Sequence, residues 1–263
     1  MRTSNFGASP RIKSRPEQCE LHGEYQRTLI ESFDDKHRVT GCPRCRFDAI
    51  HGTDEAARAA AVESKQWEAV NAALFATGIA ARFRQCSLDN YRTPLAGQKA
   101  ALDECRAYVD QFQENYDAGR CLLLLGNFGN GKTHLGCAVL KAVVRQYGAT
   151  ALYVPAADII AAIKSSFGRD SAVTEQAIFE ELASVDLLLI DEIGAQGGTE
   201  FERQALHTII DARYRNMFPT IVTSNLPSAE LAAYIGDRAL DRLRENGGLA
   251  VIFDWDSARG GDV

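Results

Sequence analysis

The stretch GNFGNGKT at residues 126–133 decides the fold, and it directly follows the apolar run CLLLL. An apolar strand, a glycine-rich loop and the start of a helix, in this order, form the arrangement that binds phosphate groups. The spacing of Gly126, Gly131, Lys132 and Thr133 fits the pattern G-x-x-x-x-G-K-[ST]. These four fixed positions recur by chance in roughly one chain in a hundred of this length. We therefore interpret the stretch as a nucleotide-binding loop.

Each part of this loop has a physical role. Glycines let the backbone curl so that its N–H groups face phosphate oxygens, and the helix that begins near Thr133 adds the positive end of its dipole. Lys132 can reach the outer phosphates, and the Thr133 hydroxyl can ligate Mg²⁺. The predicted nucleotide-binding residues are Gly126, Asn127, Phe128, Gly129, Asn130, Gly131, Lys132 and Thr133.

The segment LLLIDE at 187–192 supplies the second part of the predicted site. Its apolar residues indicate a buried strand that ends in Asp191 and Glu192. Asp191 can hold Mg²⁺, because this ion prefers oxygen ligands, and Glu192 is suited to polarise an attacking water molecule. Two acids can also simply begin a loop, but their position downstream of a glycine-rich loop favours the catalytic interpretation.

Three polar residues further along the chain have two open interpretations. Asn225 follows the predicted strand 219–224, and it either contacts the γ-phosphate or begins a turn before Pro227. Arg238 and Arg242 are four residues apart, on one face of a predicted helix. They form either an exposed, salt-bridged basic face or an arginine finger that acts in the active site of a neighbouring subunit.

From residue 79 onward, apolar strands alternate with helical stretches. Short buried strands that alternate with helices predict a parallel sheet covered on both faces. The glycine-rich loop then lies at the carboxyl edge of this sheet, where such sheets bind ligands. The predicted strands are 121–125, 150–154, 186–190, 219–224 and 249–253, and the predicted helices are 97–115, 132–147, 156–167, 175–184, 200–215 and 228–245.

The amino-acid composition restricts the cellular compartment of the protein and the partners that it can bind. The chain has 263 residues and an ordinary apolar fraction of 46%. No apolar run reaches the length of about 18 residues that a membrane span needs, so we expect no membrane partner. The net charge is −6, which restricts any DNA contact to a local basic patch. Seven cysteines, an odd number, indicate a reducing cytoplasm rather than a disulfide scaffold.

Two cysteine- and histidine-containing pairs near the amino terminus predict a metal site. Each pair has two residues between its members, and nineteen residues separate the pairs. Three thiolates and one imidazole at this spacing suit a closed, structural Zn²⁺ site, and the metal would supply folding free energy that so short a segment lacks. His37 and His51 are alternative ligands, and a flexible leader with unrelated cysteines is the other interpretation. The predicted ligands are Cys19, His22, Cys42 and Cys45.

From about residue 79 to 258, the chain resembles the helicase-loader branch of the AAA+ ATPases, the DnaC type. The segments CSLDNY at 86–91 and VIFDWDSARG at 251–260 carry this resemblance most specifically, because nucleotide chemistry does not require them. The other similar segments are GQKAALDECRAYVDQF at 97–112, VPAADIIAAIKSSF at 154–167, VDLLLIDEIG at 185–194 and GDRALDRLR at 236–244.

The resemblance implies an AAA+ P-loop ATPase that binds ATP with Mg²⁺, and residue roles follow from it. The glycine-rich loop would be Walker A, and Asp191 with Glu192 would be Walker B. Asn225 would be sensor 1. Arg238 would be the first candidate for the arginine finger and Arg242 the second.

The same resemblance implies partners. A loader of this type binds a hexameric replicative helicase, places it on single-stranded DNA and self-associates through the ATPase interface. Positions that match the DNA-contacting segment fall at about 164–175 and include Lys164, Phe167 and Arg169. Only ten residues follow Phe253, so we expect no lid domain and weak turnover by an isolated monomer.

Four parts are predicted in the chain. Residues 1–16 form a disordered basic tail, and residues 17–52 form a zinc-binding domain. This domain departs from loaders whose amino-terminal region is purely helical. In other loaders a zinc-bearing amino-terminal region is associated with helicase docking. The Ala- and Glu-rich stretch 53–78 forms a linker helix, either packed or acting as a hinge. Residues 79–263 form the AAA+ domain, with a five-stranded parallel sheet.

Three other functions compete with a helicase loader. An IstB-type transposition helper shares the AAA+ core but acts with a transposase on target DNA; the ending VIFDWDS and the zinc segment favour the loader. Intact Asp191 and Glu192 argue against an adaptor that binds ATP without hydrolysing it. A small-molecule P-loop kinase lacks support, because no acceptor-binding segment is visible.

Overall fold

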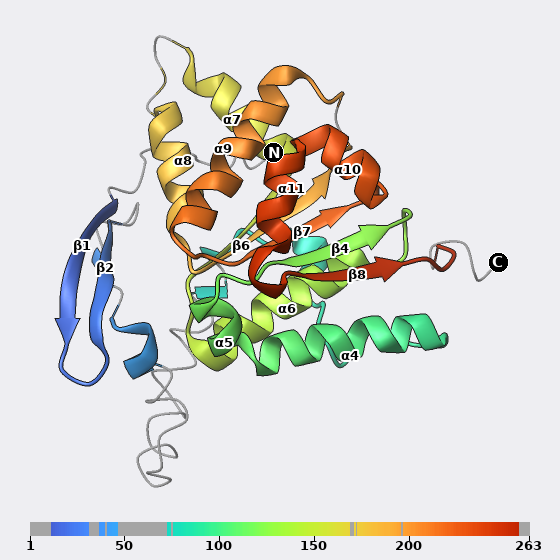
Figure 1. The fold of residues 1–263 in the computed structure, drawn as a ribbon, viewed down its shortest axis with the longest axis horizontal. Coiled ribbons are helices and arrows are strands. Elements are labelled where there is room, and N and C mark those ends of the chain that lie inside the picture. The colour runs from blue at the N-terminus through green and yellow to red at the C-terminus, as the bar shows by residue number, and fades with distance from the viewer. Residues whose placement is uncertain are drawn as a thin grey trace, which may run out of the picture.

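The computed structural model describes residues 12–31, 37–39, 41–46, 73–74, 76–168, 171, 173–195 and 197–257. A small antiparallel sheet formed by the first two of these ranges lies beside a larger α/β domain (Figure 1). None of the helices in the described ranges combines the length and the apolar character that crossing a bilayer requires.

The α/β domain is built on a five-stranded parallel sheet, as predicted. The strand order is β5-β6-β7-β4-β8, so β4 lies between β7 and β8. The glycine-rich loop therefore begins at the carboxyl end of a central strand, with polar strand ends beside it. The strands are β4 (Leu122–Gly126), β5 (Ala151–Pro155), β6 (Leu187–Ile193), β7 (Thr220–Ser224) and β8 (Leu249–Phe253).

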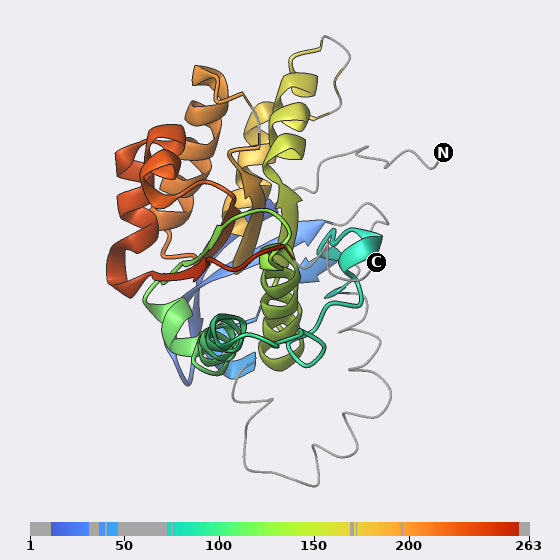
Figure 2. The same ribbon diagram turned by 90° about the vertical axis from the view of Figure 1, so that its right-hand side faces the viewer.

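Helices cover both faces of this sheet (Figure 2). Leu122 and Leu124 of β4 pack into the core on one face, and Leu123 and Leu125 pack into the core on the other. Burial on both faces explains why the strand reads as a continuous leucine run. One face carries α4 (Ala96–Asp110) and α6 (Lys132–Tyr147), and the other carries α7 (Ala156–Ser166), α8 (Glu175–Ser184), α9 (Glu200–Arg215), α10 (Ser228–Ile235) and α11 (Asp237–Arg244). The short elements are α5 (Phe112–Asp117), η1 (Ala81–Phe83) and η2 (Glu245–Gly247).

Two predicted helices are each divided in the structure. The predicted helix 228–245 is wrong as one element, because Gly236 adopts φ +92°, which ends α10 before α11 begins. The predicted helix 97–115 divides at Gln111 into α4 and α5. The predicted helix 200–215 is confirmed, and Thr199 with Glu202 forms the capping box at its start.

The amino-terminal segment corrects one prediction. Residues 12–16 do not belong to a disordered tail, because they begin β1 (Ile12–Cys19), which pairs with β2 (Gly23–Glu31). Gly23, at φ +81°, permits the tight turn between these strands, and β3 (His37–Val39) completes the sheet. Residues 1–11 and most of the predicted linker helix lie outside the described residues.

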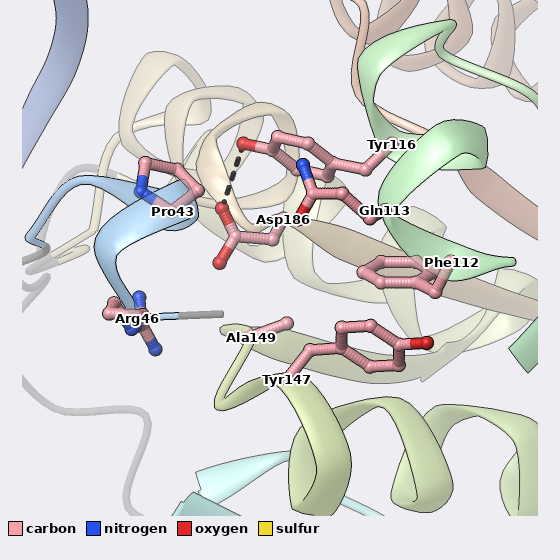
Figure 3. Close-up of a pocket in the computed structure, with 8 residues that line it drawn as sticks. All are labelled: Pro43, Arg46, Phe112, Gln113, Tyr116, Tyr147, Ala149 and Asp186. Atoms are coloured by element: carbon pink, nitrogen blue, oxygen red, sulfur yellow. Dashed lines mark hydrogen bonds between the residues drawn. The ribbon is translucent and has the colours of Figure 1, made fainter. Parts of the chain in front are cut away.

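The amino-terminal segment contacts the α/β domain next to a small pocket. Pro43 and Arg46 line this pocket from the amino-terminal segment, opposite Tyr116 and Asp186 (Figure 3). Tyr116 donates a hydrogen bond of 3.2 Å to Asp186. Asp186 immediately precedes β6, so the segment lies at the amino edge of the sheet, away from the glycine-rich loop.

A fully buried arginine joins α9 to the sheet. Arg213 is 1% exposed, and its guanidinium donates hydrogen bonds to the Thr220 hydroxyl at 2.9 Å and to the Pro219 carbonyl at 2.7 Å. It also donates to the carbonyls of Leu182 and Val185, each at 2.9 Å. Burial lowers the pKa of Arg213 to about 10. One side chain thus satisfies the ends of three neighbouring elements.

We predict that Arg213→Met lowers the free energy of unfolding by about 3 kcal/mol, because it leaves buried carbonyl groups without donors. Arg215→Met in the same helix is the matched control, since Arg215 is largely exposed and forms a surface ion pair with Asp211. Its expected effect is below about 1 kcal/mol. Denaturant unfolding of both variants measures the difference, and equal effects would contradict the role assigned to Arg213.

Candidate nucleotide-binding site

The glycine-rich loop has a backbone that only glycine can provide. Gly126, Gly129 and Gly131 adopt φ values of +144°, +81° and +92°. A Cβ atom at Gly126 would collide with the carbonyl of Phe253, and one at Gly129 would collide with the Ser257 side chain. The loop is therefore curled tightly against the segment that follows β8, as close phosphate approach requires.

Lys132 lies within this loop at the start of α6. Its side chain is 6% exposed, and its ammonium donates to the carbonyl of Gly126 at 2.7 Å and to the carbonyl of Asn127. Asn127 and Phe128 are exposed at the tip of the loop. A cation held beside a helix N-terminus is the charge pattern that binds a phosphate chain.

Asp191 is a buried carboxylate held by three hydroxyl groups. It is 2% exposed at the end of β6. Its Oδ1 accepts hydrogen bonds from Thr133 at 3.0 Å and from Thr223 at 2.5 Å, and its Oδ2 accepts one from Tyr153 at 2.9 Å. Burial, followed by the charge of Asp191, raises the pKa of Tyr153. The Thr133 hydroxyl and Asp191 together form an oxygen donor set that suits Mg²⁺.

Sequence reasoning missed Tyr153 and Thr223. Tyr153 is the hydroxyl-bearing residue of β5, and Thr223 lies in β7 together with Thr220 and Ser224; both strands pair with the strand that carries Asp191. The hydroxyl groups within these predicted strands were the available signal in the sequence. Only the strand order, however, shows that they lie next to the carboxylate of Asp191.

Glu192 is placed differently from Asp191. Its side chain is exposed, and its backbone adopts φ +57° where the pairing of β6 with β7 shifts register. The N–H of Glu192 donates to the Thr223 hydroxyl at 2.9 Å, so Thr223 contacts both acids. Asn225 follows β7 directly, at the same edge of the sheet. The two predicted acids and the predicted amide therefore lie on adjacent strand ends.

The two candidate arginines on α11 have different surroundings. Arg242 forms an ion pair of 2.5 Å with Asp211 of α9, and its guanidinium lies 5.3 Å from the centre of the Tyr214 ring. Arg238 is exposed and makes no hydrogen bond or ion pair with the described residues. Arg242 is thus held by α9 of its own chain, whereas Arg238 is an exposed cation.

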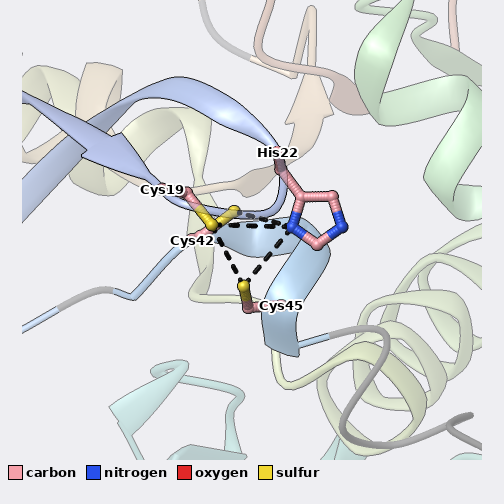
Figure 4. A group of neighbouring side chains, drawn as sticks. All are labelled: Cys19, His22, Cys42 and Cys45. Carbon is pink, nitrogen blue, oxygen red and sulfur yellow. Dashed lines mark hydrogen bonds between the residues drawn. The ribbon is translucent and has the colours of Figure 1, made fainter.

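The predicted metal ligands lie together at the turn between β1 and β2 and on the helical turn over residues 43–46 (Figure 4). All four ligand atoms lie within 4.8 Å of one another. Nδ1 of His22 lies 3.7, 3.6 and 3.3 Å from the sulfur atoms of Cys19, Cys42 and Cys45. Tetrahedral Zn²⁺ with bonds of about 2.0–2.3 Å places its ligand atoms about 3.3–3.8 Å apart, so the three distances from His22 fit the ion.

Two thiols of this cluster are within hydrogen-bond distance. The Sγ atoms of Cys19 and Cys45 lie 3.2 Å apart. The hydrogen bond between them is the largest cause that lowers the pKa of Cys19 to about 6, and the same bond raises the pKa of Cys45 to about 12. A dication among these atoms would favour the thiolate forms, as metal binding by cysteine requires.

The segment predicted to contact DNA is only partly described. Phe167 is 59% exposed and lies edge-on to Phe201, with ring centres 5.9 Å apart. Lys164 lies over the same Phe201 ring at 5.7 Å. Arg169 lies outside the described residues.

Comparison with known proteins identifies relatives. Residues 108–244 match the family described as "IstB-like ATP binding protein". The replicative helicase loader DnaC of Escherichia coli strain K12 is 36% identical over 183 residues, which cover 70% of this chain and 73% of that protein. DnaC of Buchnera aphidicola from Acyrthosiphon pisum is 34% identical over the same length.

Solved structures share the fold. The crystal structure of the DnaC helicase loader aligns with a TM-score of 0.60 and 26% identity, over 66% of this chain and 99% of that one. AMPPCP-bound DnaA from Aquifex aeolicus aligns with a TM-score of 0.55 and 22% identity, over 68% and 52% of the two chains, which shows a common fold only. The chain belongs to the family of IstB-like ATP-binding proteins, with an AAA+ fold and with the DnaC helicase loaders among its relatives.

Proposed function

We propose that this protein is an ATP-hydrolysing helicase loader, which binds a hexameric replicative helicase and assists its placement on single-stranded DNA. The observation that carries the proposal is the 36% identity to DnaC over 70% of the chain, together with the grouping of Lys132, Thr133 and Asp191 at one sheet edge. The exposed Phe167 beside Lys164 and Phe201 offers a stacking surface and a positive charge for single-stranded DNA.

In this proposal each residue of the site has a separate role in ATP hydrolysis. The loop N–H groups and Lys132 bind the phosphates of ATP. Mg²⁺, held by Thr133 and Asp191, would neutralise charge on those phosphates. Glu192 is exposed and orients the attacking water, while Asn225 contacts the γ-phosphate or that water. Arg238 enters from a neighbouring copy and stabilises charge in the transition state.

A transposition helper of the IstB type remains the competing proposal, since the matching family carries that name. Purified protein mixed with a hexameric replicative helicase should form a complex that is stable in gel filtration. ATP and single-stranded DNA should change the lifetime of that complex. Binding to a transposase with no binding to the helicase would reject the loader and favour the helper.

We predict that Arg238→Ala lowers ATP hydrolysis by the assembled protein about a thousandfold, the lower end of the range expected for loss of an arginine finger. Glu192→Gln should also abolish hydrolysis while ATP binding persists. Mixing these two inactive variants should restore part of the activity, because one kind of mixed interface then combines an intact Glu192 with an intact Arg238.

Arg242→Ala is the matched control for this experiment. It removes the ion pair with Asp211, so its main effect should be a loss of stability of about 1 kcal/mol, with hydrolysis retained. Hydrolysis that is lost in Arg242→Ala and kept in Arg238→Ala would reverse the assignment. Wild-type protein that binds ATP but never hydrolyses it would favour the adaptor.

We further propose that the cluster of three cysteines and one histidine binds Zn²⁺ and forms a structural site. The seven cysteines are free thiols, which agrees with the reducing cytoplasm expected for a replication protein.

Elemental analysis of the full chain should therefore find about one zinc per molecule. Cys42→Ser should lose this metal. Cys86→Ser, which changes a buried cysteine outside the cluster, should keep it. Wild-type protein without zinc, or equal zinc in Cys42→Ser, would remove the claim.

A further inference from the structure

Two sequence segments that nucleotide chemistry does not require meet at one carbonyl of the glycine-rich loop. The Tyr91 hydroxyl, from the segment before the first strand of the parallel sheet, donates to the carbonyl oxygen of Asn130 at 3.1 Å. The indole Nε1 of Trp255, from the segment after the last strand, donates to the same oxygen, also at 3.1 Å. Both lone pairs of this carbonyl are therefore occupied.

The side chain of Asn130 strengthens the same junction. Asn130 is 2% exposed, and its Nδ2 donates to the carbonyls of Phe253 and Trp255, at 2.9 Å each. The amide is thus directed into the protein, so only the backbone of Asn130 is left to face a nucleotide. The nucleotide-binding role predicted for Asn130 therefore falls to its backbone.

Both donors are themselves held in place. Trp255 is 7% exposed, and its ring lies 4.8 Å from that of Phe253. Tyr91 packs edge-on against His134 at 5.3 Å, and Nε2 of His134 lies 3.1 Å from the carbonyl of Ser87. Burial lowers the pKa of His134, which favours the neutral ring in this contact. The two donors therefore come from packed positions and not from mobile side chains.

Peptide geometry connects this junction to the nucleotide. In a planar trans peptide the carbonyl oxygen and the following N–H point in opposite directions, and the described residues contain no cis peptide. Holding the Asn130 carbonyl against Tyr91 and Trp255 therefore directs the N–H of Gly131 to the opposite side. Gly131, at φ +92°, lacks the Cβ that would limit rotation of this peptide.

We propose that Tyr91 and Trp255 are positioning residues for nucleotide binding, which fix the Asn130–Gly131 peptide so that its N–H faces the phosphates. The inference rests on the ATP binding in the proposed function and deepens it. The proposal assigns a role to the segments 86–91 and 251–257. One lies before the first strand of the parallel sheet and the other includes its last strand, and both contact the glycine-rich loop. Neither side chain needs to touch the nucleotide.

The test compares Tyr91→Phe, Trp255→Phe and the double variant with the wild type. Calorimetry with Mg²⁺ and a non-hydrolysable ATP analogue should show that each single change raises Kd by about three- to tenfold, the range expected for one lost hydrogen bond. The double variant should bind more weakly than either. The kcat at saturating ATP should stay within about twofold of the wild type, because the changes leave Asp191 and Glu192 intact.

Tyr108→Phe is the matched control. Tyr108 is 3% exposed and donates a hydrogen bond of 2.7 Å to the carbonyl of Arg120, which precedes the amino end of β4, whereas the loop follows the carboxyl end of that strand. Its removal should reduce thermal stability about as much as Tyr91→Phe does, with Kd unchanged.

The outcomes separate this inference from the proposed function. Wild-type affinity in Tyr91→Phe, Trp255→Phe and the double variant would overturn the inference and leave the loader proposal standing. An equal rise of Kd in Tyr108→Phe would overturn it too, since general destabilisation would then explain the loss. Wild-type protein that binds no ATP would contradict both.

Discussion

The nucleotide site depends on how closely the glycine-rich loop approaches the chain around it. Three glycines with positive φ place the loop backbone against Phe253, Ser257 and the Tyr91 ring, at distances that leave no room for a Cβ. The loop does not hold this shape alone. Segments from before the first strand and after the last strand of the parallel sheet form its walls, so the site exists only when the whole α/β domain has folded. Local sequence supplies the flexibility of the loop, and tertiary contacts select its conformation.

A second constraint is the buried charge of Asp191. Burying a carboxylate in an apolar sheet costs free energy unless the carboxylate is hydrogen-bonded. The strand order places a hydroxyl donor on each side of Asp191. β5 contributes Tyr153, and β7 contributes Thr223. Thr223 also accepts from the N–H of Glu192, which holds the register shift that turns Glu192 outward. The Thr223 hydroxyl thus contacts both adjacent acids, of which Asp191 is buried and Glu192 is exposed.

The sequence predicts the parts of this molecule whose signal is local. Short apolar runs locate the strands to within one residue, except that β6 ends three residues beyond the predicted 186–190. The spacing of the two cysteine- and histidine-containing pairs locates a cluster whose ligand atoms are close enough to hold a metal ion. The predictions that failed depended on backbone conformation or on pairing between segments. Gly236 breaks one expected helix because of its positive φ, and residues 12–16 form a strand only because β2 pairs with them. The contacts of Asn130 with Tyr91 and Trp255 join positions 39 and 125 residues apart, so no local pattern contains them.

The positions of the two sites on the sheet limit how they can communicate. The amino-terminal cluster contacts the α/β domain near Asp186, at the amino edge, whereas Asp191 and the glycine-rich loop lie at the carboxyl edge (Figure 1). β6 runs directly between these two aspartates. The described side chains of the amino-terminal segment therefore do not reach the glycine-rich loop. β6 connects the two positions directly, since Asp186, just before its start, accepts a hydrogen bond from the Tyr116 hydroxyl, and Asp191, near its end, accepts hydrogen bonds from three hydroxyls. This strand is therefore a packed element through which ATP binding can influence the amino-terminal segment.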